Sequence, residues 1–382
     1  MIVWLLSTLL LPASAHLAER WAPNSEIFPL VDLIYNVDLS SAAAAAKRLS
    51  ETYPQDPAGP FYRGLVLYQH LIMEEVRSTT TLAAFEDDMR RAEEQSQKWL
   101  AQAPARSYYY LGAAEGFHAR FLVAQNRYFK AVPEGTRSIR HLRRALELDP
   151  KLEDAYLGVG MYHYFRTRIP TAAKPFAVIF FGEFGNRELG LTELQRAADK
   201  GDLAKTEALS ILAAIYSSDE EAQWVKAAPI LEQLMTRYPH NPLYRLRAAY
   251  VAARMGQWDR AAALAEPDGN WLDALEPEIR ENTRSLALYR AAEAWALGGH
   301  PEKVEKLLDQ IESRRLTEPF VDWVLLRRAN IYDWQGNKLG ADRLYGAIKD
   351  PDAARAAKLY LRLRYPKFLP AFKPLTGIEY PY

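Results

Sequence analysis

Residues 142–165 read LRRALELDPKLEDAYLGVGMYHYF, and this stretch decides the fold. Leu142 and Ala145 follow Ser138 by four and seven residues. The three residues therefore lie at i, i+4 and i+7, which is the spacing of one face of an α-helix. Pro150 ends that helix, because proline donates no backbone hydrogen bond and its ring clashes with the preceding turn. The stretch therefore predicts one helix that stops at this proline and a second that starts directly afterwards.

The second helix carries glycines in its interior. Asp154 can cap a helix that begins at Ala155. Within that helix Tyr156, Gly160 and His163 share one face. Glycine costs about 1 kcal/mol relative to alanine inside a helix, and close approach of a neighbouring helix is the simplest compensation. We therefore expect Gly160 to lie at a helix–helix contact.

The small, large, small, proline order of this stretch resembles the tetratricopeptide repeat (TPR) superfamily. The residues that carry the resemblance are Ser138, Leu142, Ala145, Pro150, Tyr156 and Gly160. The same order recurs at Ala227, Leu231, Leu234 and Pro239. Ala261 follows Ala227 by 34 residues, which is the period of the family. The resemblance implies an all-α fold, a right-handed α-solenoid of antiparallel helical hairpins.

Other segments fit the same architecture. Residues 158–165 and 185–201, GVGMYHYF and GNRELGLTELQRAADKG, are similar to a group of uncharacterised exported bacterial TPR proteins, and this resemblance implies no known activity. Turns between helices are expected at Gly256-Gln257, Gly298-Gly299 and Gly336-Asn337. We expect about seven or eight helical hairpins in all.

The predicted organisation has three parts, namely a signal peptide at residues 1–15, a TPR-like solenoid at 16–365 and a tail rich in proline and aromatics at 366–382. Residues 170–185, PTAAKPFAVIFFGEFG, depart from the repeat as an irregular apolar loop. This loop is either a buried wedge between repeats or an exposed contact surface. The tail either folds over the last hairpin or docks to a partner.

The first fifteen residues, MIVWLLSTLLLPASA, indicate export. They form a short apolar run that ends in Ala13-Ser14-Ala15, a small-x-small pattern typical of cleavage before His16. No Lys or Arg precedes the run, so a retained N-terminal helix, and with it a cytoplasmic TPR adaptor, stays an alternative. The chain has no cysteine, which excludes a lipid anchor attached to cysteine as well as disulfides. We predict a protein exported to the periplasm.

Charge narrows the classes of partner. Lys+Arg and Asp+Glu both number 48, so the net charge is zero. Nucleic-acid binding requires a basic field that displaces phosphate counterions, so no nucleic-acid partner is expected. After residue 15 no second apolar run reaches the roughly 20 residues of a membrane-spanning helix, so no stable membrane insertion of the mature chain is expected.

No reactive constellation is recognisable. The seven histidines are scattered singly without an H-E-x-x-H pair, and His163 occupies a packing position, so a core histidine is favoured over a metal ligand. No strand precedes Gly158-Val159-Gly160, which makes it a packing motif rather than a dinucleotide loop. We predict no catalytic residue, no cofactor and no metal. A basic group, made of Arg137, Arg140, His141 and Arg144, is either an exposed outer stripe or a site for an acidic partner.

The resemblance places ligands on the concave face of a hairpin stack. The residues carried onto that face are Tyr109, Met161, Tyr164, Tyr250, Arg254, Arg327 and Asn330. Leucines (Leu157, Leu246 and Leu326) occupy the slot where carboxylate-clamping repeats carry lysine, which argues against that function. We expect a non-enzymatic scaffold that binds another protein or peptide. The alternatives are a cell-envelope enzyme, such as a peptidoglycan-acting hydrolase with a carboxylic acid in a dry cleft, and the cytoplasmic adaptor.

Overall fold

The computed structural model describes residues 21–73, 79–125, 127–168, 185–312 and 320–364. In these residues the chain forms seventeen α-helices and one 3-10 turn, without any strand, so the all-α prediction is confirmed. The predicted signal peptide, all of the predicted apolar loop except Gly185, and the predicted tail lie outside the described residues.

The chain divides into two compact units, and the division falls after Ala208. The first unit contains α2 (Asn24–Tyr35), α3 (Leu39–Thr52), α4 (Ala58–Met73), α5 (Thr79–Lys98), α6 (Pro104–Ala124), α7 (Tyr128–Leu148), α8 (Ala155–Phe165), the 3-10 turn η1 (Arg166–Arg168), α10 (Arg187–Lys200) and the first residues of α11 (Lys205–Tyr216). The second contains the rest of α11, then α12 (Trp224–Arg237), α13 (Pro242–Arg254), α14 (Trp258–Ala265), α15 (Pro277–Leu297), α16 (Pro301–Glu312), α17 (Phe320–Trp334), α18 (Lys338–Ala347) and α19 (Pro351–Leu363).

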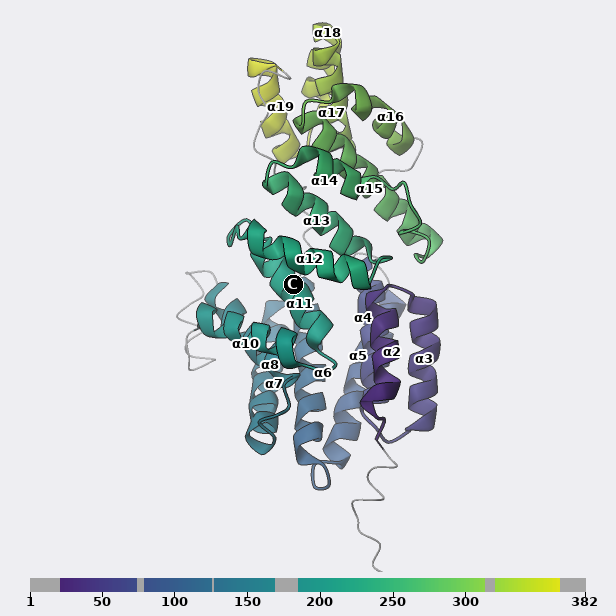
Figure 1. The fold of residues 1–382 in the computed structure, drawn as a ribbon, viewed down its shortest axis with the longest axis vertical. Helices are drawn as coiled ribbons and strands as arrows, with labels where there is room; N and C mark the ends of the chain where they lie inside the picture. Colours follow the sequence, from purple (N-terminus) through teal and green to yellow (C-terminus); the bar gives the residue numbers. More distant parts are fainter. Residues whose placement is uncertain (1–20, 74–78, 126, 169–184, 313–319, 365–382) are drawn as a thin grey trace, which may run out of the picture. The chain divides into compact units, whose positions relative to one another are not determined.

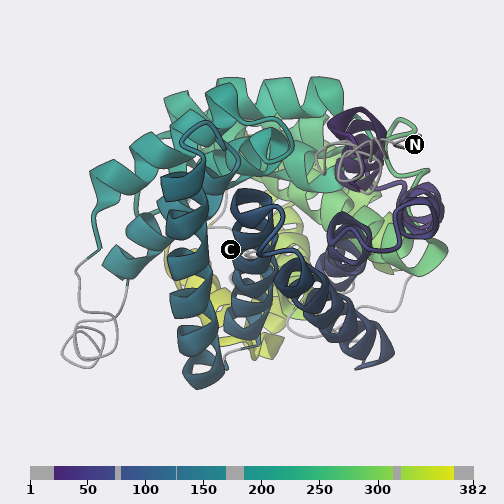
Figure 2. The ribbon, with the colours of Figure 1, turned by 90° about the horizontal axis from the view of Figure 1, so that it is seen from below.

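Consecutive helices pack against each other within each unit (Figure 1). In the first unit the contacts run in chain order from α2 to α10, and α6 also touches α4 and α8. Figure 2 shows this unit with α2 and α3, in purple, at one side and α10, in teal, at the other. In the second unit the contacts run from α12 to α18, and α19 packs on α17 and α18. This arrangement is compatible with a helical repeat, in which each element mainly contacts its neighbours.

The stretch that decided the fold has the expected geometry at its glycines. Helix α7 ends at Leu148, before the proline, and α8 begins at Ala155. A Cβ atom on Gly160 would lie 2.8 Å from the backbone nitrogen of Leu194 and 2.9 Å from the carbonyl oxygen of Gly190. The two helices α8 and α10 therefore approach each other more closely than any side chain would permit. The predicted role of this glycine is confirmed.

The role predicted for Asp154 needs a correction. Helix α8 does begin at the next residue, but no side-chain hydrogen bond from Asp154 caps it. The buried carboxylate instead accepts hydrogen bonds from the backbone N–H groups of Leu203, at 3.3 Å, and Ala204, at 3.0 Å. These groups lie just before α11, so the carboxylate satisfies the start of a different helix. Burial raises the pKa of Asp154 above its ordinary value.

The second unit confirms the turns that were predicted from glycine. Gly256, Gly299 and Gly336 have φ values of +74°, +87° and +81°, a conformation that glycine adopts without the penalty of a Cβ atom. They connect α13 to α14, α15 to α16 and α17 to α18. The predicted packing positions Ala227 and Leu231 in α12 are both fully buried. Tight turns and small buried residues together let consecutive helices lie close to each other.

Candidate binding pocket in the first unit

The first unit contains a pocket of about 1340 Å³. Its lining residues come from α2, α4, α6, α7, α8 and η1, together with Asp154 just before α8 and residues at and just before the start of α11. All of them belong to the first unit. Sites for drug-sized ligands usually occupy roughly 300–1,000 Å³. This pocket therefore has room for a large apolar group or for several side chains of a partner.

Small residues on the central helix create the space. Helix α6 contacts four other helices of the unit, so its sequence is apolar on most faces. On the side that faces the pocket it carries Gly112, Ala113 and Gly116, followed by the ring of Phe117. At Gly112 the neighbouring helix α7 packs closely, because a Cβ atom there would meet Leu142 at 2.6 Å. The small side chains thus allow close helix packing at one point and leave room beside it.

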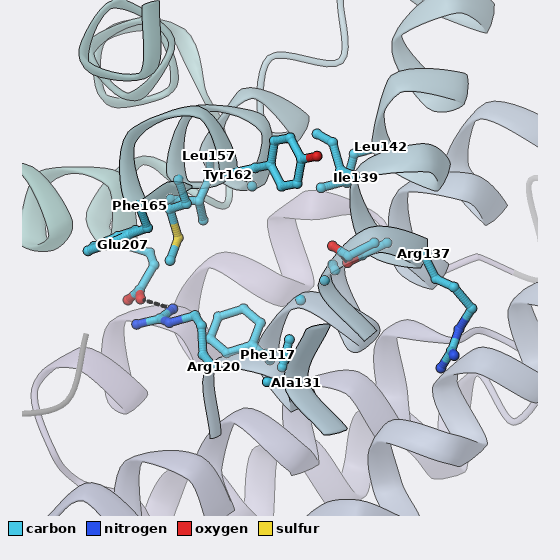
Figure 3. Close-up of a pocket in the computed structure, with 18 of the residues that line it drawn as sticks. Phe117, Arg120, Ala131, Arg137, Ile139, Leu142, Leu157, Tyr162, Phe165 and Glu207 are labelled. Atoms are coloured by element: carbon cyan, nitrogen blue, oxygen red, sulfur yellow. Dashed lines mark hydrogen bonds and ion pairs between the residues drawn. The ribbon is translucent and has the colours of Figure 1, made fainter. Parts of the chain in front are cut away.

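The polar groups inside the pocket are already paired with each other. Arg120 donates from Nη1 to Oε1 of Glu207 at 2.6 Å, an ion pair drawn in Figure 3, and the hydroxyl of Tyr35 donates to Oε2 of the same carboxylate at 2.7 Å. The guanidinium also lies 5.0 Å from the ring centroid of Phe117. The hydroxyl of Ser138 on α7 donates to the carbonyl oxygen of Gly112 on the preceding helix α6. The remaining wall is mostly apolar and aromatic, including Leu157, Tyr162 and Phe165 (Figure 3).

Exposed aromatic side chains also line the pocket. Tyr128 and Phe129, at the start of α7, are 55% and 98% exposed, and Val123 at the end of α6 is exposed as well. Isolated exposed apolar residues are common on proteins, but two aromatic rings continuous with an apolar pocket indicate a contact surface. They extend the apolar wall outward to solvent.

The predicted basic group on α7 is partly neutralised. Arg137 bonds to Glu115 at 3.0 Å and also to Glu134, and its side chain points away from the pocket interior in Figure 3. His141 bonds to the other oxygen of Glu115 at 2.7 Å. Arg140 is exposed, lines the pocket and makes no hydrogen bond or ion pair within the described part of the chain. Arg144 is exposed as well and pairs with Glu147 at 2.6 Å, so Arg140 is the exposed member of the predicted group whose charge is not paired within the described residues.

The predicted groove residues separate into four sets, two in each unit. Tyr109 and Met161 line the pocket, on α6 and α8. Tyr164, although on the same helix, is buried and accepts a hydrogen bond from Arg168. In the first unit the structure therefore brings two of the three predicted residues to one site and encloses the third among neighbouring side chains.

The predicted residues of the second unit lie in two places. Tyr250 donates its hydroxyl to Asp219 at 2.6 Å, and Arg254 pairs with the same carboxylate at 3.5 Å, so both are partly exposed members of one small polar cluster. Arg327 and Asn330 are 3% and 0% exposed. These two side chains lie inside the packed interior of the second unit, so neither belongs to the candidate site.

The buried pair has its own partners. Arg327 donates to Oε1 of Glu293 at 2.6 Å and to the side-chain oxygen of Asn330 at 3.1 Å. Asn330 in turn donates to the hydroxyl of Tyr345 at 2.8 Å. These contacts pair the buried charges inside the second unit, because a buried charge must be paired to be tolerated.

A cluster of titratable groups lies beside the pocket, on α5, α6 and α7. Burial, together with the neighbouring Glu115 and Glu134 carboxylates, raises the pKa of Glu93 to about 7. His118 is 3.8 Å from Glu134, and Arg137 bonds to both neighbouring acids. Glu93 itself does not line the pocket.

His163 has the position predicted for a core histidine. It is buried, its Nδ1 lies 2.5 Å from Glu193 of α10, and Arg143 donates to its Nε2 at 3.1 Å. Among the described residues, no group of three or more His, Asp and Glu side chains has an arrangement that could hold a metal ion.

Comparison with protein-family models and with curated proteins finds no match for this chain. In the segments that the structure describes, no helix combines the length and the apolar character needed to cross a bilayer. The site must therefore be interpreted from its own residues.

Proposed function

We propose that this chain is a non-enzymatic helical-repeat protein of the TPR type that binds a segment of another protein in the pocket of the first unit. The pocket is the observation that carries the proposal, because it is large, mostly apolar, rimmed by exposed aromatics and lined by the predicted residues Tyr109 and Met161. A rigid frame of packed helices fixes several contact side chains at once, which limits the ordering cost of binding.

The bound segment is a helix in this proposal. The pocket interior offers few hydrogen-bonding groups, and Arg120, Tyr35 and Glu207 are paired with one another. An extended peptide would bury backbone N–H and C=O groups without partners, at a cost of roughly 1–3 kcal/mol for each group. A helix satisfies its own backbone and presents only an apolar face, the mode of recognition in which large side chains at i, i+3, i+4 and i+7 enter a groove.

The finer description of the fold is part of the same proposal. The short glycine turns after α13, α15 and α17 and the 34-residue spacing of Ala227 and Ala261 favour antiparallel hairpins stacked in a right-handed solenoid. Export to the periplasm rests on the apolar first fifteen residues. The mass of the mature protein tests export. A mass that corresponds to a chain starting at His16 would support export, and one that corresponds to a chain starting at Met1 would support the cytoplasmic adaptor.

Filling the pocket tests the binding proposal. Ala113 lines the pocket and is half-buried, so Ala113→Trp places an indole in the cavity. Ala44 lies exposed on α3, outside the pocket, so Ala44→Trp is the matched control. Partner recovery from an envelope extract should fall at least tenfold for Ala113→Trp and stay unchanged for Ala44→Trp. Equal recovery by the three proteins, with unchanged circular dichroism, would refute the assignment of the pocket.

The cell-envelope hydrolase is the second candidate function, although the acid that bears on it, Glu93, lies beside the pocket and does not line it. Such an enzyme needs a carboxylic acid that stays protonated near neutral pH, and Glu93 has a pKa raised to about 7. Turnover of purified peptidoglycan that disappears in Glu93→Gln would establish this function in place of the binding role.

A further inference from the structure

The ion pair inside the pocket leaves part of its guanidinium unused. Arg120 bonds to Glu207 through Nη1 alone. In the described part of the chain its Nε is buried without a hydrogen-bond partner, and its Nη2 makes no hydrogen bond either. Arg120 lines the pocket with 12% of its side chain exposed. A guanidinium has five N–H donors, so an occupant of the pocket meets a cation whose donors are only partly paired.

Neighbouring side chains hold this guanidinium in place. The guanidinium carbon of Arg120 lies 5.0 Å from the ring centroid of Phe117 and 5.4 Å from that of Tyr68, and Figure 3 shows the Phe117 ring beside it. The carboxylate of Glu207 fixes it from α11 and is itself held by the hydroxyl of Tyr35 on α2. Contacts from four helices thus position the unpaired donors before anything binds, which lowers the ordering cost of binding.

The pair of Arg120 and Glu207 offers both donors and acceptors to an occupant. Each carboxylate oxygen of Glu207 accepts one hydrogen bond, from Arg120 or from Tyr35, whereas a carboxylate has about four lone-pair sites. Both side chains line the pocket, and each is 12% exposed. A primary amide matches this pair, because its oxygen accepts from the guanidinium and its NH₂ group donates to the carboxylate.

Other occupants fit this pair less well. The charge of Arg120 is already balanced by Glu207 at 2.6 Å. A second carboxylate would lie close to that of Glu207 in a mostly apolar pocket, where an uncompensated charge is unfavourable. A wholly apolar group would cover the unpaired N–H donors and leave them without water or any other acceptor. A neutral amide avoids both penalties.

We propose that the occupant of the pocket is a helix whose apolar face carries one glutamine or asparagine, and that its side-chain amide binds to Arg120 and Glu207. This inference rests on the proposed function and specifies its partner. The large apolar side chains of the helix fill the space beside Leu157 and Phe165. A site that hydrogen-bonds a ligand group rejects an analogue without that group more strongly than an apolar pocket discriminates by size. The ion pair therefore selects among helices that share the same apolar face.

The test uses three fluorescein-labelled model helices of equal length with the same leucine and phenylalanine face. The central residue of that face is Gln, Met or Glu, which have similar helix propensities. Fluorescence anisotropy at neutral pH should show the Gln helix binding about tenfold more tightly than the Met helix. The Glu helix should bind no more tightly than the Met helix. The comparison changes only the ligand, so it does not depend on the folding of any variant.

Removing the ion pair as a unit assigns the preference to it. Arg120→Met combined with Glu207→Met leaves neither charge in the pocket and should bring the Gln and Met helices to within about twofold of each other. The pair of Arg196 and Glu153 does not line the pocket. Arg196→Met combined with Glu153→Met is therefore the matched control, and it should keep the tenfold preference. A tenfold preference that survives the loss of the pocket pair would overturn the inference.

The outcomes separate this inference from the proposed function. If the Gln and Met helices bind equally and Ala113→Trp abolishes both, the pocket binds helices and only the amide preference is refuted. If no helix binds, or if Ala113→Trp changes nothing, the proposed function fails together with the inference. If the Glu helix binds most tightly, the pocket recognises charge and the inference is overturned. The same holds if oleamide, which carries a primary amide on an acyl chain, displaces the Gln helix and binds more tightly than it does.

Discussion

Replacing Gly160 by alanine tests the helix contact on which the fold prediction depends. The nearest obstruction to a Cβ atom is the backbone nitrogen of Leu194 at 2.8 Å, whereas ordinary contact begins at 3.4 Å. Helices α8 and α10 would therefore have to separate by about 0.6 Å. Overpacking of this kind costs about 1–3 kcal/mol, and alanine contributes about 1 kcal/mol of helix stability relative to glycine. We expect a net destabilisation of up to about 2 kcal/mol.

A matched control exists in the same unit. Gly135 lies in the interior of α7, and a Cβ atom there would meet only the Cβ of Ala119, at the ordinary distance of 3.9 Å. Gly135→Ala should therefore stabilise the protein by up to about 1 kcal/mol. Urea denaturation, followed by far-UV circular dichroism, compares Gly160→Ala with Gly135→Ala. The urea concentration at the midpoint is the quantity compared, because a stack of helices need not unfold in two states and a free energy of unfolding would then be undefined. A midpoint for Gly160→Ala that rises as much as that for Gly135→Ala would refute the close contact.

A double variant sharpens the test. Gly190 faces the same crossing, where its Cβ would lie 2.7 Å from the carbonyl oxygen of Gly160 and 2.5 Å from the backbone nitrogen of Tyr164. Once the first alanine has separated the helices, the second has more room. The combined loss should therefore be smaller than the sum of the two single losses. Strictly additive losses would show that the two glycines do not share one contact.

Three further predictions concern buried polar groups. Burial and two neighbouring glutamates raise the pKa of Glu93 from 4.5 to about 7, so the stabilisation from its bound proton is complete below pH 4.5 and is lost as pH rises through 7. Glu93→Gln should therefore raise the urea midpoint at pH 8 but not at pH 4.5. A difference in midpoint that is the same at both pH values would contradict this. Arg327→Ala removes the 2.6 Å partner of the buried Glu293, which keeps Arg290 at 3.3 Å, so the second unit should lose about 1–3 kcal/mol. Partner recovery by the first-unit pocket should stay the same. Asp154→Ala removes the acceptor for the backbone N–H groups before α11, so the protein should lose about 1–3 kcal/mol of stability. The loss should appear as faster hydrogen exchange of the Ala204 amide. Unchanged exchange would refute the role of the carboxylate.

The helices and turns were predictable because their signals are local. Pro150 disfavours continuation of the preceding helix through its ring and its missing N–H group, and Gly256 and Gly336 mark turns through a conformation that glycine adopts easily. Gly160 was predictable because a glycine inside a helix carries a cost that only a close neighbour offsets. The partner of Asp154 was not, since nothing near it in sequence shows that its carboxylate reaches the start of α11.

The pocket depends on residues that are distant in sequence. Tyr35 and Glu207 are 172 residues apart, and neither carries a signal that it will meet Arg120 inside a cavity. The resemblance to the TPR superfamily placed Arg327 on the concave face but could not show whether another helix covers that face. In the structure Tyr360 of α19 lies over it, with its hydroxyl 3.4 Å from the guanidinium. A local pattern defines a face, and only the fold decides whether that face is open.

Photo-crosslinking at the pocket tests the central claim most directly. A photoreactive residue in place of Phe129, which lines the pocket and is 98% exposed, should form a discrete adduct with a partner protein in intact cells. The same residue in place of Leu339, which is 76% exposed in the second unit, should not form that adduct. Adding Ala113→Trp should abolish the adduct from position 129. Equal adducts from both positions, or an adduct that survives the filled pocket, would contradict the account.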